Sequence, residues 1–102
     1  MSLKAQIQTD LKAAMKAGRT EERDTLRLLL TALLNAEKAA GQDLSDEESG
    51  QVAAKVVKQA RNSIEEYGKL DQADAVAKLE GELAIYLKYA PVQLDDAAIR
   101  AI

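Results

Sequence analysis

The sequence predicts an all-α fold, a four-helix up-and-down bundle followed by the start of a fifth helix. Apolar residues recur at spacings of three and four along four segments of the 102-residue chain. Capping residues and glycines separate these segments, and no stretch shows the strict alternation of a half-buried strand. Because the connections are short, we expect consecutive helices to run antiparallel.

The first two helices are expected near residues 3–17 and 21–40. Ser2 is a suitable N-cap for the first, and Gly18 can end it. Thr20 is a cap candidate for the second helix, acidic residues follow it at once, and Gly41 ends the helix. The residues expected to face the core are Leu3, Ile7, Leu11, Ala14 and Met15 in the first helix, and Leu26, Leu29, Leu30, Leu33 and Leu34 in the second.

The third and fourth helices are expected near residues 46–67 and 72–89. Ser45 and Glu48 match the capping-box pattern, and Gly68 is the expected stop of the third helix. Asp71 can cap the fourth helix, which must end before Pro91. The residues expected to face the core are Val52, Val56, Ala60, Ser63, Ile64 and Tyr67 in the third helix, and Val76, Leu79, Leu83, Tyr86 and Leu87 in the fourth.

The pattern of helices divides the chain into two parts of unequal size. Residues 1–90 are expected to form one helical-bundle domain, a size consistent with a single core. Residues 91–102 are expected to be a linker and the start of a truncated C-terminal helical region, with Asp95 or Asp96 as cap. The helical pattern there ends after about two turns, which is too short for an independent helix.

The composition argues against a catalytic centre. The chain has no cysteine and no histidine, which removes thiolate chemistry, cysteine ligands and the commonest general base. Glu80 and Glu82 are two residues apart, so on a helix they point about 200° away from each other and cannot work as a pair. We expect no catalytic residue, no cofactor and no metal site. The sequence also has no apolar stretch long enough to span a membrane and no secretory signal, which predicts a cytoplasmic protein.

The formal charge of −3 is distributed unevenly, at +2 for residues 1–40 and −5 for residues 41–102. An acidic chain needs a local basic surface to bind nucleic acid. Lys55, Lys58 and Arg61 provide one on the outer side of the third helix, where they could contact an RNA backbone. The same residues also fit a solvated helix face that pairs with Glu65 and Glu66, and no aromatic residue lies among them.

Arg19, Arg23 and Arg27 recur every fourth residue, and Arg23 and Arg27 fall beside the leucine stripe of the second helix. They could form a phosphate-contacting row. Alternatively, their stems cover apolar surface while their guanidinium groups pair with carboxylates of a neighbouring helix, such as Glu80 or Glu82. We predict the second, structural role for Arg23 and Arg27.

Four segments, in this order, resemble the GatB/YqeY family, and most of all its small stand-alone YqeY-like proteins. They are Arg27-Leu28-Leu29 with Asn35-Ala36-Glu37, Lys58-Gln59-Ala60-Arg61-Asn62-Ser63-Ile64, Glu80-Gly81-Glu82-Leu83, and Tyr89-Ala90-Pro91-Val92-Gln93-Leu94. Ala60, Gly81 and Ala90 depart from the family pattern. Family members also continue into a further small helical domain, which we expect to be missing here.

The resemblance implies an accessory helical domain that binds tRNA and has no active site of its own. By family association it is linked to glutamine-dependent tRNA amidotransferases, which are carbon-nitrogen ligases with glutamine as amido-N-donor. The implied partners are tRNA, or an amidotransferase or aminoacyl-tRNA-related protein. The alternative is a protein-interaction module with no nucleic-acid role, which would use an exposed groove between helices. A self-sufficient enzyme is disfavoured because a nucleotide-binding loop and an activated nucleophile are both missing.

Overall fold

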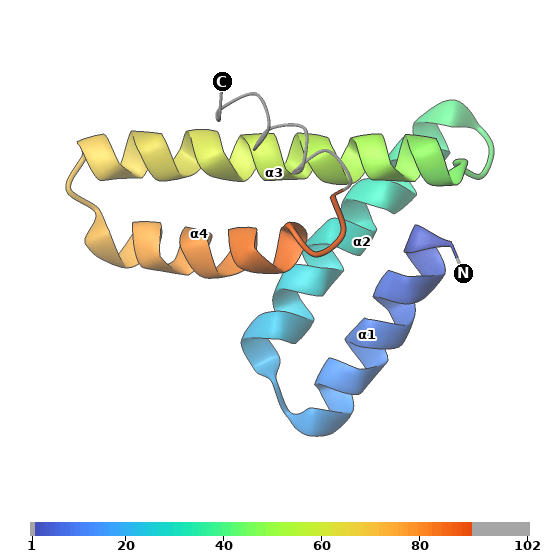
Figure 1. The fold of residues 1–102 in the computed structure, drawn as a ribbon, viewed down its shortest axis with the longest axis horizontal. Coiled ribbons are helices and arrows are strands. Elements are labelled where there is room, and N and C mark those ends of the chain that lie inside the picture. The colour runs from blue at the N-terminus through green and yellow to red at the C-terminus, as the bar shows by residue number, and fades with distance from the viewer. Residues whose placement is uncertain (1, 91–102) are drawn as a thin grey trace, which may run out of the picture.

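The computed structural model describes residues 2–90, and over that range the chain is all-helical (Figure 1). The four helices are α1 (Leu3–Ala17), α2 (Thr20–Ala40), α3 (Asp46–Lys69) and α4 (Ala73–Tyr86). The predicted fold class is thereby confirmed. The predicted linker and fifth helix of residues 91–102 lie outside the described residues.

The helix starts show which caps the sequence predicted correctly. The Ser2 hydroxyl accepts a hydrogen bond from the Ala5 amide, and Ser45 and Glu48 form the complete capping box of α3. Thr20 does not cap α2, because it lies inside that helix and Arg19 occupies the N-cap position without a side-chain cap. Likewise Gln72, not Asp71, is the N-cap of α4.

The helix ends depend on where the backbone adopts a left-handed conformation. Gly18 and Gly41 have φ values of 72° and 73° and end α1 and α2 as predicted. Gly68 was wrongly predicted to end α3, which continues to Lys69 because the reversal uses Asp71, with φ of 57°. α4 ends at Tyr86, earlier than predicted, and turn hydrogen bonds from Tyr89 and Ala90 to the Tyr86 carbonyl follow.

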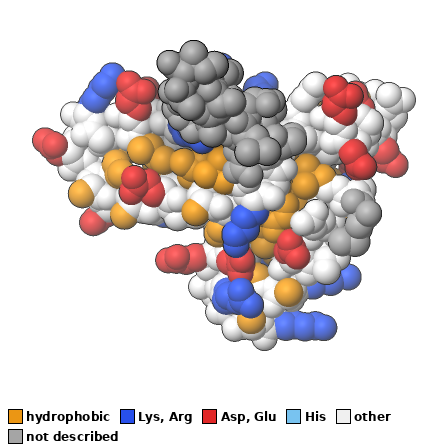
Figure 2. Space-filling view, in the orientation of Figure 1, with side chains coloured by type: hydrophobic (Ala, Val, Ile, Leu, Met, Phe, Trp, Pro, Cys, Tyr) orange, Lys and Arg blue, Asp and Glu red, His pale blue; other side chains and the backbone are white. Residues whose placement is uncertain are grey.

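The four helices form two antiparallel hairpins, α1 with α2 and α3 with α4 (Figure 1). The α1–α2 hairpin runs at a steep angle to the α3–α4 hairpin, and α2 packs against both α3 and α4. Hydrophobic side chains line the seam within each hairpin (Figure 2). One cluster of buried residues joins the two hairpins: Ile7, Ala14, Leu26, Leu29, Leu33, Ala53, Val57, Ala60, Tyr86, Tyr89 and Ala90.

Three residues predicted to face the core are exposed instead. Met15, Leu34 and Tyr67 have relative exposures of 51%, 44% and 42%. In α3 the fully buried edge runs through Ala53 and Val57, one residue away from the predicted positions. These residues differ from the prediction because the two hairpins cross at an angle. The apolar stripe of each helix therefore contacts the neighbouring helices over only part of its width and length.

Candidate nucleic-acid interface

The three basic residues singled out in the sequence lie on α3, the longest described helix. Lys55 and Lys58 are exposed, on the side of the helix away from the buried Ala53 and Val57. Arg61 is half-buried. The structure therefore presents two lysines fully to solvent and places the arginine at the edge of the same surface.

The charges in the middle of α3 are all positive. Residues 49–64 of α3 contain no aspartate or glutamate, so Lys55, Lys58 and Arg61 are their only charges. The first acidic residue on either side of this stretch, Glu48 and Glu65, has a contact of its own. Glu48 accepts a hydrogen bond from the Ser45 amide at 2.9 Å, which with the Ser45 side chain lowers the pKa of the Glu48 carboxyl. Glu65 pairs with Lys69 at 3.5 Å.

Arg19 and Arg23 contact carboxylates of α2. The distance from Arg19 to Glu22 is 3.2 Å, and that from Arg23 to Asp24 is 2.9 Å. Arg23 is half-buried and Arg27 is exposed. The carboxylate that Arg23 contacts thus belongs to Asp24 and not to Glu80 or Glu82. The structural role of Arg23 and Arg27 stays a prediction.

Two polar contacts between distant parts of the chain were not predicted from the sequence. The Tyr89 hydroxyl donates a hydrogen bond of 2.6 Å to the Asp10 carboxylate, which joins the turn after α4 to α1. Burial, and then the hydrogen bond and charge of Asp10, raise the pKa of Tyr89. The sequence feature that could have indicated this contact is the position of Asp10 between Ile7 and Ala14, on the buried stripe of α1.

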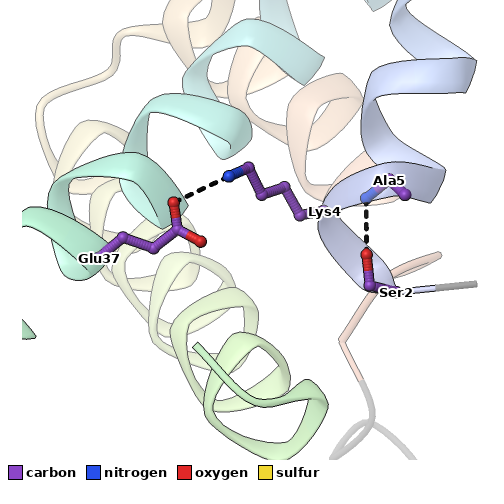
Figure 3. A network of polar contacts seen from close by, with 4 residues as sticks. All are labelled: Ser2, Lys4, Ala5 and Glu37. Carbon is purple, nitrogen blue, oxygen red and sulfur yellow. Dashed lines mark hydrogen bonds and ion pairs between the residues drawn. The ribbon is translucent and has the colours of Figure 1, made fainter. Parts of the chain in front are cut away.

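The second contact joins α1 and α2 at the open end of their hairpin, away from the turn that connects them. Lys4 Nζ lies 3.0 Å from Glu37 Oε1, so the first turn of α1 is paired with the last part of α2 (Figure 3). The Ser2 cap lies beside it, with its hydroxyl accepting from the Ala5 amide (Figure 3). Both side chains of the pair are partly buried, and the contact is structural.

The described residues hold no group of three or more acidic, histidine or cysteine side chains placed to bind a metal ion. Every buried side-chain nitrogen or oxygen in this part of the chain has a hydrogen-bond partner. No described helix is long and apolar enough to cross a membrane. The chemistry that this surface offers is charge-based binding through exposed lysines.

Fold and surface together define a small helical domain with a basic helix face. A sequence model of the family described as Yqey-like protein matches residues 4–102, and the chain belongs to that family. It is also similar to a protein of Lachancea thermotolerans named "Altered inheritance of mitochondria protein 41, mitochondrial", with 35% identity over 86 residues. The matched region covers 83% of this chain and 46% of that protein, so the chain spans about half the length of its curated relative.

Proposed function

We propose that this YqeY-like domain is an accessory tRNA-binding domain that acts beside a glutamine-dependent tRNA amidotransferase or another aminoacyl-tRNA-related protein. Catalysis would take place in that partner. The observation that supports the proposal is the acid-free stretch of α3, with Lys55 and Lys58 exposed on it. We include a cytoplasmic location in the proposal.

The proposed contacts are to the RNA backbone, not to its bases. Lysine ammonium groups neutralise phosphates without reading sequence, and base recognition in RNA usually requires aromatic stacking. Tyr67, the exposed tyrosine of α3, lies six residues beyond Arg61, and no aromatic residue lies among Lys55, Lys58 and Arg61. The domain would therefore supply affinity, while the partner supplies specificity for the tRNA.

A tRNA titration at two salt concentrations tests the proposal. Three phosphate contacts predict an affinity that falls roughly 20- to 40-fold between 50 and 200 mM salt. Replacement of Lys55, Lys58 and Arg61 by glutamate should abolish binding at the lower salt concentration. The matched control replaces three exposed lysines on other helices, Lys12, Lys16 and Lys38, by glutamate.

The control has the same net charge as the test variant, so it separates the α3 face from the overall charge. Retained binding in the control and lost binding in the test variant would support the proposal. Equal binding by the test variant and the parent would remove the α3 face as the RNA site. If the parent itself does not bind at low salt, the alternative of a protein-interaction module is favoured.

A further inference from the structure

A hollow of about 420 Å³ lies between α2 and α4. The uncharged part of its lining comes from Thr25 of α2 and from Ala77, Gly81 and Ile85 of α4. The Thr25 side chain is buried, and its hydroxyl donates a hydrogen bond of 2.8 Å to the Glu21 carbonyl. Because that proton is already used within α2, this part of the hollow offers an apolar surface and no free side-chain donor for an anion.

The other residues that line the hollow are charged, and most are acidic. Glu21 and Asp24 come from α2 and Glu82 from α4, and Lys78 is the one basic residue among them. Asp24 pairs with Arg23 at 2.9 Å. No salt bridge among the described residues involves Glu21, Lys78 or Glu82. Two carboxylates, one on each helix, are thus available to a cation that enters the hollow.

The acidic character continues along α4 beyond this hollow. From residue 71 to residue 82 the chain carries Asp71, Asp74, Glu80 and Glu82, and Lys78 is the single basic residue. A smaller hollow of about 340 Å³ at the α3–α4 turn has Asp71 and Glu80 in its lining and no basic residue. A surface with charges of one sign attracts ligands of the opposite sign and repels phosphate. This side of the domain therefore favours a cationic partner.

We propose that the hollow between α2 and α4 binds a basic segment of a partner protein and receives one of its arginine side chains. The arginine stem lies against Ala77, Gly81 and Ile85, and the guanidinium group pairs with the carboxylates of Glu21 and Glu82. Arginine suits this lining because its stem covers apolar surface while its planar head donates several hydrogen bonds to carboxylates. Charge complementarity selects this occupant over RNA, for which the basic face of α3 is the better surface.

The test uses a fluorescein-labelled peptide of six arginines, with its binding to the full chain measured by fluorescence anisotropy at low salt. The parent should bind the peptide. Replacing both Glu21 and Glu82 by glutamine should weaken binding about fivefold or more, because two charge pairs are lost. The matched control replaces Glu65 and Glu66, two exposed acids near the end of α3, by glutamine. It changes the net charge equally and should bind nearly as tightly as the parent.

Gly81→Leu tests the hollow without changing any charge. A Cβ atom at Gly81 would meet no atom within 4 Å, so the new side chain occupies open space in the hollow. Leucine is also the better helix former, so the fold should be retained, which thermal unfolding checks. We expect this variant to bind the peptide severalfold more weakly. Ala39→Leu, at an exposed alanine of α2, is the control and should bind like the parent.

Weaker binding by both hollow variants, with both controls unchanged, would support the proposal. Equal weakening in the Glu65 and Glu66 control would show general attraction to an acidic chain and overturn it. So would unchanged binding by Gly81→Leu, or no binding by the parent at low salt. Peptide binding that falls as the protein concentration rises would assign the hollow to a second copy of the chain and overturn it as well. The result is separate from the RNA proposal, since the variant with glutamate at Lys55, Lys58 and Arg61 should still bind the peptide.

Discussion

At the scale of single residues, Tyr86 and Tyr89 resist ionisation. Burial, with the charge of Glu82, raises the pKa of Tyr86 to about 12. Burial also raises the pKa of Tyr89, and its contact with Asp10 adds to the shift. Tyrosines of the unfolded chain lose their protons near pH 10. The stabilisation from both residues is therefore complete below pH 10 and is lost as the pH rises towards the folded-state values.

We expect the free energy of unfolding to fall between about pH 10 and pH 12. Urea unfolding at several pH values, with tyrosinate absorbance recorded in parallel, measures it. Tyr86→Phe and Tyr89→Phe should each make the fall shallower. Tyr67→Phe, at the exposed tyrosine, is the control and should leave the pH dependence nearly unchanged. The same slope in all four proteins would contradict the assigned cause.

Leu33 and Leu28 on α2 form a second matched comparison. Leu33 is 1% exposed and belongs to the core, whereas Leu28 is 55% exposed. Leu33→Ala should cost about 2–5 kcal/mol because it leaves a cavity among well-packed neighbours. Leu28→Ala should change stability by about 0.5 kcal/mol or less. Chemical denaturation measures both, and similar losses would show that the core side of α2 is wrongly assigned.

At the scale of single helices, the capping box of α3 is the best defined local signal. Ser45→Ala removes the acceptor for the Glu48 amide and should destabilise the protein by about 0.5–2 kcal/mol. Ser63→Ala, in the interior of the same helix, is the control. Thermal unfolding followed by circular dichroism gives both values. If Ser63→Ala proves the more damaging change, the cap does not contribute as described.

Local signals predicted most of the helix boundaries. Ser2, Ser45, Gly18 and Gly41 each satisfy backbone groups within four residues, so sequence spacing alone is enough to identify them. Gly68 misled the prediction because a glycine need not adopt a positive φ, and the reversal was made at another residue.

In the candidate site, too, features that depend on local sequence could be predicted and contacts between distant residues could not. That Lys55 and Lys58 are exposed follows from helical periodicity, which the sequence contains. The contact of Tyr89 with Asp10 joins residues 79 positions apart, and no local pattern specifies such a pairing. The carboxylate partner of Arg23 was likewise not predictable, because the flexible side chain selects among several nearby acids once the helices are in place.

At the scale of the whole molecule, the angle between the hairpins is what the sequence did not provide. Helical periodicity fixes which side of each helix is apolar, but the crossing angle depends on how side chains of different helices interlock. The exposure of Met15 and Tyr67 follows from that angle. So does the joining of both hairpins through Leu29, Leu33 and Val57 in one continuous cluster.

A single shared core predicts that both hairpins unfold together. In a Tyr67→Phe background, tyrosine fluorescence reports only Tyr86 and Tyr89, at the end of α4, because the chain has no tryptophan. Circular dichroism reports all the helices. We expect the two signals to give the same midpoint in urea. Leu26→Ala in α2 should shift both midpoints equally, although it lies in the other hairpin, because its side chain belongs to the cluster that holds Tyr86. Separate midpoints, or a shift in only one signal, would show that each hairpin is stable on its own.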